Sequence, residues 1–284
     1  MKNINIKLKI CLIFGLFAFN SAILIADEVN ESEDNAHSGG YFKIGVGYRF
    51  ETSPYNDEKS ELSIFLDGGY QWENGIFVEA PGVSNKLNPG FTVGYNLYNT
   101  QHWNFDFIGN SAHGIIEYGV TENDESIYIK RDGTFRAGFR ATGNYGQNTI
   151  QFNITPYSFN DEYGDGIHAS VWFAKQWQIK NWNAHASIGV QYLSEEILDY
   201  YYGIPDEIAI SNSPAYKAKS GFNTSFQIGA DYPISQNWVF ESYLRYTDLA
   251  DSINDSPIMY NAIKFGTSRS ENITEAGILV NYVF

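Results

Sequence analysis

The feature that most constrains the fold of this chain is a two-residue alternation of apolar and polar side chains that recurs along its length. In residues 182–192 every second side chain is apolar, and the side chains between them are small or polar. The same pattern appears in 42–50, 133–142 and 222–232. Successive side chains of a strand point to opposite faces, so the pattern predicts strands with one apolar face. The segments approach the ~9–11 residues of a membrane-spanning strand, and their polar face suits a wet lumen.

The carboxy-terminal residues 274–284 carry the same alternation and end on an aromatic residue. Phe284, Tyr282 and Val280 fall on one face of the predicted strand, followed by further apolar residues at steps of two. This ending resembles the closing strand of bacterial outer-membrane β-barrels. The resemblance implies recognition by the barrel-assembly machinery, with these three residues as the assembly signal. A soluble sheet that ends on its last strand is the alternative.

Residues 1–26 have the layout of a secretory signal peptide. Three lysines precede an apolar run from Ile10 to Ala26 that contains no charge. We expect cleavage after Ala26, with Ala22 as the alternative. An amino-terminal membrane anchor is less favoured, because the run is at the short limit for a spanning helix. The only cysteine, Cys11, lies in this segment, so the mature chain has no disulfide and no thiol chemistry.

The composition argues against a helical membrane protein. After residue 26 no segment approaches the roughly 20 consecutive apolar residues of a spanning helix. The chain is nevertheless rich in aromatic residues, with 21 Tyr, 20 Phe and 6 Trp, and it contains 26 Gly. Transmembrane barrels combine these properties, because their strands are only half apolar and aromatic girdles mark both interfaces. The sequence therefore predicts an all-β, antiparallel, up-and-down transmembrane barrel.

The predicted strands and loops give the organisation of this barrel. We expect about 12 strands, at 40–50, 61–73, 75–80, 90–98, 102–109, 133–142, 147–158, 165–177, 182–193, 221–232, 237–247 and 273–284. Short connections at 73–75, 99–101, 143–146, 178–181 and 233–236 alternate with longer ones at 51–60, 81–89, 110–132, 159–164, 194–220 and 248–272. This asymmetry predicts short periplasmic turns, long outer loops and both termini in the periplasm. The domains are the signal 1–26, an acidic disordered lead-in at 27–39 and one barrel at 40–284.

The net charge of −15 is carried by the lead-in and the loops rather than by the strands. Ionisable residues predicted to face the lumen are nearly balanced, and we expect them to form a charge network that neutralises itself across a narrow bore. They are Lys43, Arg49, Asp67, Asp106, Arg136, Arg140, Asp231, Glu241 and Arg245. A ligand-binding lumen is the alternative.

The acidic loops indicate which partners suit the chain. Nucleic acid is not expected, because its binding depends on cationic contacts to phosphate. One interpretation is that the acidic residues keep the exposed loops soluble. A more specific hypothesis is that divalent cations link these carboxylates to lipopolysaccharide phosphates, since Ca²⁺ and Mg²⁺ favour oxygen ligands. Outer-membrane lipid and lipopolysaccharide are therefore expected partners.

The residue types of catalytic sites do not converge in this sequence. His168 and His185 face inward on neighbouring predicted strands, but their positions differ by roughly 20 Å along the strand direction, too far apart to share a metal. His113 lies beside Ser111 in a predicted loop, a pairing that any loop-rich chain offers. We predict a protein that is not an enzyme, with no catalytic, cofactor-binding or metal site.

Two segments of the second half carry a family resemblance. One is Tyr200-Tyr201-Tyr202-Gly203, and the other runs from Asp248 to Ser256-Pro257-Ile258. Together with the closing strand they resemble the MltA-interacting protein (MipA/OmpV) family of Gram-negative outer-membrane barrels. The resemblance covers roughly 165–284 by motif and the first half by strand pattern only. After Ser53-Pro54-Tyr55 the expected Gly-Ser pair is replaced by Asn56-Asp57.

This resemblance implies a non-enzymatic scaffold in the outer membrane. Its partners would be a lytic transglycosylase and a penicillin-binding protein, in peptidoglycan synthesis and remodelling. A narrow porin-like channel and an outward-facing adhesin remain alternatives, because a fold does not fix a function. With short periplasmic turns, a scaffold surface would have to use the lead-in 27–39 and turns such as 233–236. That area is small beside the roughly 800 Å² per partner of a standard interface.

Overall fold

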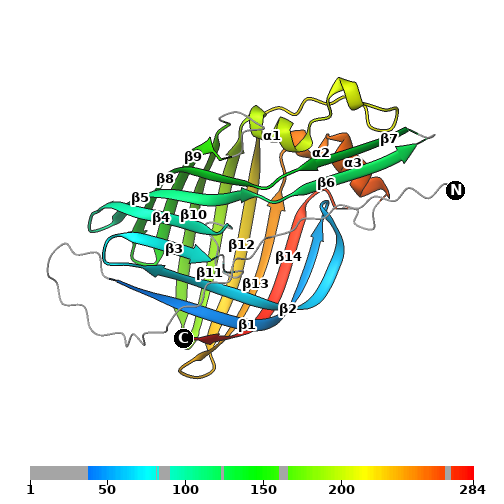
Figure 1. Ribbon diagram of the computed structural model, residues 1–284. Coiled ribbons are helices and arrows are strands. Elements are labelled where there is room, and N and C mark those ends of the chain that lie inside the picture. Colours follow the sequence, from blue (N-terminus) through cyan, green and yellow to red (C-terminus); the bar gives the residue numbers. More distant parts are fainter. Residues whose placement is uncertain (1–37, 81, 83–89, 123–124, 160–165, 266–269) are drawn as a thin grey trace.

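The computed structural model describes residues 38–80, 82, 90–122, 125–159, 166–265 and 270–284, and most of them form a closed barrel (Figure 1). The strands of its wall are antiparallel and follow the order β1-β14-β13-β12-β11-β10-β9-β8-β5-β4-β3-β2. Their bounds are β1 Gly39–Ser53, β2 Asn56–Gln71, β3 Ile76–Ala80, β4 Thr92–Asn99, β5 Trp103–His113, β8 Thr134–Tyr145, β9 Asn148–Ser158, β10 His168–Ile179, β11 Trp182–Leu193, β12 Gly221–Pro233, β13 Trp238–Asp248 and β14 Ile273–Val283. The predicted all-β antiparallel barrel is confirmed.

The alternation in the sequence becomes the two faces of the barrel wall. On β11 the side chain of Ile188 points outward and is 49% exposed, whereas Ser187 beside it is buried. On β12 Phe226 faces outward and Gln227 faces inward, where it is 2% exposed. An apolar outer face is stable against lipid, and the ring of strands pairs the backbone polar groups that lipid cannot satisfy.

The lumen is partly filled by large side chains, which differs from the wet interior that the polar inner face predicts. Six large inward-facing apolar side chains are at most 8% exposed: Phe65, Phe77, Ile108, Trp172, Tyr243 and Leu279. Glycines on adjacent strands make room for the rings. A Cβ at Gly189, the register partner of Trp172, would lie 2.2 Å from the indole. A barrel of this size therefore packs part of its interior as a core.

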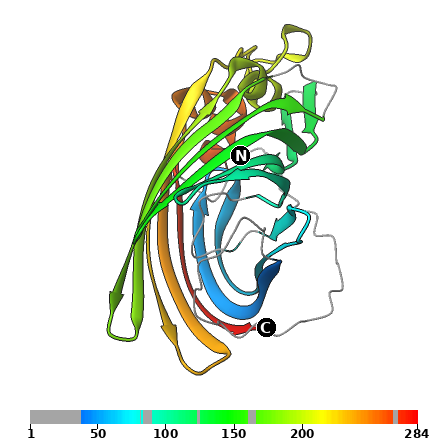
Figure 2. The same ribbon diagram turned by 90° about the vertical axis from the view of Figure 1, so that its left-hand side faces the viewer.

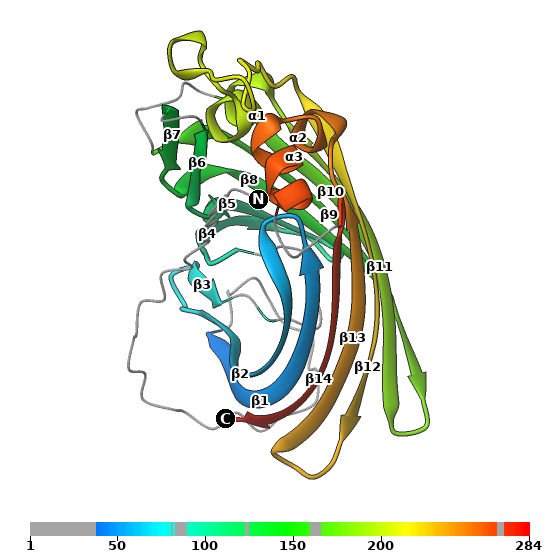
Figure 3. The same cartoon turned by 90° about the vertical axis from the view of Figure 1, so that its right-hand side faces the viewer.

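The two ends of the barrel differ. At one end, called here the turn end, short connections join β2–β3, β4–β5, β8–β9, β10–β11 and β12–β13, and β14 ends there. At the other, called here the cap end, lie α1 Glu195–Tyr202, the 3₁₀ helix η1 Asp206–Ile208, α2 Asp251–Asn254 and α3 Pro257–Phe265 (Figures 1 and 3). Each of these helices, the full set that the described residues contain, falls short of the length and apolarity needed to cross a membrane.

Two segments that were predicted to be loops contain strands instead. The connection expected at 51–60 is reduced to Pro54–Tyr55, because β1 and β2 both run on beyond the apolar band. The loop expected at 110–132 contains a hairpin of β6 Ile116–Glu122 and β7 Glu125–Arg131, which projects beyond the barrel rim. Those expected at 81–89 and 159–164 fall largely outside the described residues, as do the signal 1–26 and nearly all of the lead-in 27–39.

Candidate functional site

One group of predicted lumen residues lies near the turn end, around Lys43. Its Nζ is 2.8 Å from Asp67 Oδ2 on β2 and 2.8 Å from Glu241 Oε1 on β13. The second contact reaches past β14, so it runs through the lumen rather than along one strand pair. Asp231 accepts from Asn183 Nδ2 at 3.4 Å, and its carboxylate is 3.9 Å from His185 Nδ1.

A second group centres on Arg140 of β8. Its two terminal nitrogens donate to both carboxylate oxygens of Glu79 at 2.7 and 2.9 Å, and Nε donates to Asp106 at 3.0 Å. Two parallel hydrogen bonds from a guanidinium to a carboxylate are among the strongest ion-pair geometries. Because Glu79 is on β3, this pair links strands that are not neighbours in the sheet.

The remaining arginines of the prediction lie toward the cap end in separate groups. Arg245 pairs with Glu275 at 2.8 Å and donates twice to Gln227 Oε1. Arg49 is 3.2 Å from Glu61 and 3.7 Å from Glu51. Arg136, which is fully buried, donates to the carbonyl oxygens of Thr155 and Gly166.

The structure adds four acids that the sequence reasoning missed at inward positions: Glu51, Glu61, Glu79 and Glu275. Each lies on a lumen-facing position of its strand and contacts one of the arginines described above. With them, the lumen-facing positions of the described strands carry more acids than bases. The expectation of a nearly balanced lumen is therefore wrong. Glu51 lies in a segment predicted as a loop, whereas Glu61, Glu79 and Glu275 lie in predicted strands but were not counted among the lumen residues.

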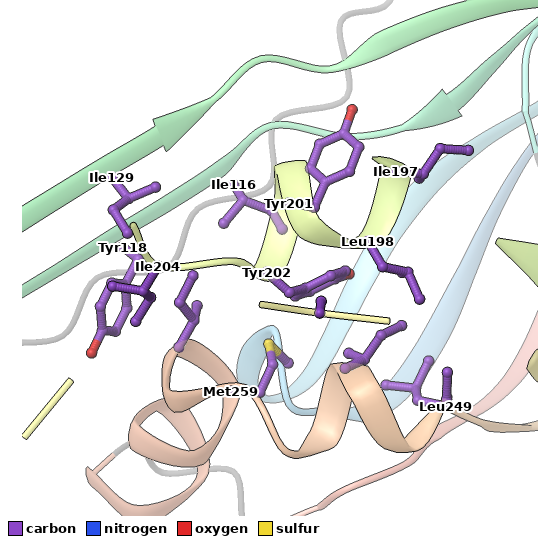
Figure 4. Packing of buried hydrophobic residues seen from close by; sticks show 14 of the residues in the cluster. Ile116, Tyr118, Ile129, Ile197, Leu198, Tyr201, Tyr202, Ile204, Leu249 and Met259 are labelled. Carbon is purple, nitrogen blue, oxygen red and sulfur yellow. The ribbon is translucent and has the colours of Figure 1, made fainter. Parts of the chain in front are cut away.

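Loops at the cap end form a structure of their own, called here the loop cap: the β6–β7 hairpin, the connection 194–220 and the connection 249–272. The loop cap has a hydrophobic core in which the hairpin, α1 and α2–α3 meet (Figure 4). Its fully or nearly fully buried members include Ile116, Tyr118, Leu198, Ile253 and Met259. Loops with a packed core of this kind hold one conformation, in contrast to the solvated loops that the acidic composition predicts.

The family-motif residues come together in this core. Tyr200-Tyr201-Tyr202 ends α1, a helix within the connection 194–220 that was expected to be a loop. Tyr201 and Tyr202 are buried, and Ser256 Oγ donates to the backbone oxygen of Tyr202 at 2.7 Å. Ser256 is itself fully buried and directly precedes Pro257 at the start of α3. The two segments that carry the family resemblance therefore contact each other directly.

A chain of aromatic and imidazole groups attaches this contact to the barrel rim. Tyr202 Oη is 2.7 Å from Tyr55 Oη and 3.0 Å from His113 Nε2, and the His113 ring stacks on Tyr201 with centroids 3.7 Å apart. His113 belongs to the end of β5, not to a loop as predicted. Burial raises the pKa of Tyr55, which lies between β1 and β2, to about 12, and also raises that of Tyr202.

Two further bonds hold the last turn of α1. Arg131 Nε donates to the carbonyl oxygen of Tyr200 at 2.6 Å, and its guanidinium lies 5.2 Å from the centre of the Tyr200 ring. Tyr201 Oη is 3.0 Å from Thr134 Oγ1. The sequence did not indicate that Tyr55, His113, Arg131 and Thr134 contact the motif, because each reaches it from a distant segment and none carries a local pattern for this contact.

The predicted assembly signal lies in the closing strand. Tyr282 and Phe284 form an aromatic group at the turn end, with centroids 4.8 Å apart and with Trp238 next to Tyr282. Phe284 N donates to Phe42 O of the first strand at 2.9 Å, so the terminal residue contributes to closure of the ring. Val280 is the register partner of Val46 on β1 and of Phe240 on β13.

The described residues offer no group of three or more His, Cys, Asp or Glu side chains placed to hold a metal ion. On the paired strands β10 and β11, His168 lies opposite Leu193 and His185 lies opposite Gln176. The two histidines are therefore far apart along the strand direction. The lumen pairs and the loop cap are the two candidate sites, and their described contacts are ion pairs, hydrogen bonds and packed rings.

A closed antiparallel barrel with an apolar outer face and aromatic ends defines an outer-membrane β-barrel protein. Residues 44–284 match the family model described as MltA-interacting protein MipA, so the chain belongs to that family. The predicted family and outer-membrane location are confirmed.

Named relatives agree with this assignment. Outer membrane protein OmpV of Vibrio cholerae is 32% identical, over 86% of this chain and 93% of that protein. MltA-interacting protein of Escherichia coli K12 is 24% identical, over 79% of this chain and 86% of that protein. Among solved structures, the NanC porin is similar over 85% of this chain and 98% of its own, with 11% identity and a TM-score of 0.44.

Proposed function

We propose that this protein is a non-enzymatic interaction protein of the outer membrane, linked to peptidoglycan synthesis and remodelling. Its partners would be a lytic transglycosylase and a penicillin-binding protein, bound from the periplasmic side. The observation that carries the proposal is the name and extent of the Escherichia coli relative, the MltA-interacting protein, which aligns with 79% of this chain. The packed lumen and the loop cap support a role in contacts rather than in chemistry.

The surface for such a partner would be the turn end. There the β10–β11 and β12–β13 hairpins reach farthest from the loop cap and lie next to each other (Figures 2 and 3). Each carries an exposed isoleucine near its tip, Ile179 at 58% and Ile234 at 55%. Polar residues dominate ordinary turns, so two adjacent apolar tips favour burial against another surface. That surface is the partner protein in this proposal.

Position-specific photocrosslinking tests the proposal. A photoreactive amino acid at Ile179 or Ile234 in living cells should give an adduct with the lytic transglycosylase. The same residue at Asn74, in the β2–β3 turn, should give none, because that turn lies on the opposite side of the strand ring. Loss of the adduct in the Ile179→Asp, Ile234→Asp double variant, with wild-type barrel levels, would support the contact. Adducts with lipid alone from both isoleucines would refute it.

A narrow channel is the second candidate function, and one observation favours it. The inward-facing positions of the described strands hold Lys43 and four arginines against a larger set of acids, from Glu51 near the cap end to Glu241 near the turn end. An acid-rich bore concentrates cations and excludes anions. If the loop cap opens, we expect a cation-selective current, which a reversal-potential measurement in a potassium chloride gradient would detect.

A further inference from the structure

The loop cap contains a polar pocket that neither the lumen pairs nor the turn end uses. It opens where the segment 211–214 meets α2, α3 and Glu271, and its volume is about 600 Å³. That size falls within the roughly 300–1,000 Å³ of small-molecule sites. Helices α2 and α3, which line the pocket, lie at the opposite end of the barrel from the proposed partner surface (Figure 3), so the pocket is independent of the function proposed above.

The wall of the pocket is held rigid by the loop cap. Asn261, which is 2% exposed, donates from Nδ2 to Asn212 O at 2.8 Å and to Ser213 Oγ at 3.1 Å. The same nitrogen is 2.8 Å from the hydroxyl of Tyr118, a fully buried residue of the β6–β7 hairpin. Three separate segments are thus tied together at the base of the pocket, which therefore has a defined shape before any ligand arrives.

The side chains that face the pocket combine one aromatic ring with planar oxygen acceptors. Tyr260 is 55% exposed at the wall. Asp251, Asp255 and Glu271 contribute carboxylates, and no lysine or arginine lies among the described lining residues. Asn254 also lines the pocket, and its Oδ1 is shielded from solvent with no hydrogen-bond partner among the described residues. The described lining is therefore rich in oxygen acceptors, with amide and hydroxyl donors of Ser211, Asn212 and Tyr260 beside them.

This combination matches a polyhydroxylated ligand. The C–H face of a pyranose ring packs on an aromatic face, and neighbouring hydroxyls donate to the two oxygens of one carboxylate. Three exposed carboxylates line the pocket and disfavour an anionic sugar, because like charges repel. We propose that this pocket binds a neutral or amino-bearing saccharide at the outer surface of the cell.

Binding to the mature full-length barrel, refolded in a detergent without sugar groups, tests this site. Isothermal titration uses two probes: chitobiose in its N-acetylated, neutral form and the glucosamine disaccharide, which carries free amino groups. It should show saturable binding of one or both. Tyr260→Ala should weaken it by about threefold to tenfold, the range expected from loss of one aromatic contact. Tyr128→Ala is the matched control, because Tyr128 is a 68% exposed tyrosine of the loop cap outside the pocket. It should bind as the wild type does.

Charge variants and further probes separate the alternatives. Asp255→Asn should weaken the glucosamine disaccharide more than chitobiose, since only the former carries ammonium groups. Sialyllactose, an anionic saccharide, should bind at least tenfold more weakly than the better of the two probes. Equal binding by Tyr260→Ala and wild type, no saccharide binding at all, or binding of spermidine alone would each overturn the proposal. Heat-modifiable migration of every variant checks that the barrel is folded.

Discussion

At the scale of single residues, the side-chain alternation assigns opposite environments to neighbours on one strand. Ile188 lies on the lipid face, between Phe173 and Phe226 in register, whereas Gln191 faces the lumen opposite Asn223. We expect Ile188→Arg to destabilise the barrel by about 2–4 kcal/mol and Gln191→Arg to cost little, because a charge on the lipid face loses its hydration. Unfolding in lipid vesicles measures both. Equal losses would show that the assigned faces are wrong.

Tyr202 offers a second test at this scale, because its hydroxyl alone joins Tyr55 to His113. Tyr202→Phe keeps the ring and leaves two buried partners unsatisfied, at a cost of about 1–3 kcal/mol. The barrel should stay folded while the loop cap loosens, so proteolysis after Lys217 and Lys219 should speed up. Tyr128→Phe is the control, since Tyr128 is 68% exposed. Unchanged loop cleavage in Tyr202→Phe would refute the attachment.

Alkaline pH should act on the same contact. The pKa of Tyr55 is raised to about 12 in the fold, whereas an unfolded phenol titrates near 10, so the folded state favours the neutral form. This stabilising effect is fully present below about pH 10 and is lost as pH rises through about 12. Tyrosinate absorbance should show a late-titrating class of phenols that becomes smaller in Tyr55→Phe. A class that is the same size in both proteins would contradict the burial of Tyr55.

At the scale of elements, strands could be predicted and loops could not. Each of the 12 wall strands overlaps a segment predicted from alternation, since the strand period is fixed by the backbone itself. The helix α1 was missed because Glu195–Tyr202 is short, and its stability comes from packing against the β6–β7 hairpin and α2. The β6–β7 hairpin was missed for a related reason, since its apolar face is buried only by the other two segments of the loop cap.

The closing strand carries the prediction for assembly. Deletion of Phe284 removes a backbone bond to Phe42 and one ring of the terminal aromatic group, while Tyr282→Asp places a charge beside Trp238. Either change should lower the amount of heat-modifiable barrel in the outer membrane, because a ring in lipid must pair every backbone group. Ile278→Val, a milder change on the same face, should assemble normally. Wild-type levels of folded barrel in the Phe284 deletion variant would contradict an assembly signal at the carboxy terminus.

At the scale of the whole molecule, the family motifs are explained by a contact that no local pattern reveals. Ser256 and Tyr202 are far apart in sequence, and only the closed barrel brings their two loops to one side of the rim. The sequence could mark both segments through resemblance alone. It could not show that the two segments contact each other within the loop cap. Nor could it show that Arg140 reaches past two strands to Glu79, because both contacts depend on the curvature of the closed sheet.

The combined effect of packed lumen and loop cap is a barrel with little or no open path. We expect small or absent single-channel conductance from the wild type in planar bilayers. Replacing Lys43, Asp67, Arg140 and Glu241 together by serine removes links between non-neighbouring strands and shortens the side chains that narrow the bore. Conductance should then rise and favour cations, because the remaining inward acids outnumber the bases. Serine replacement of Lys175 and Glu195, two charges outside these groups, should leave it unchanged. Large, stable conductance from the unmodified protein would refute the closed lumen and favour the channel over the interaction protein.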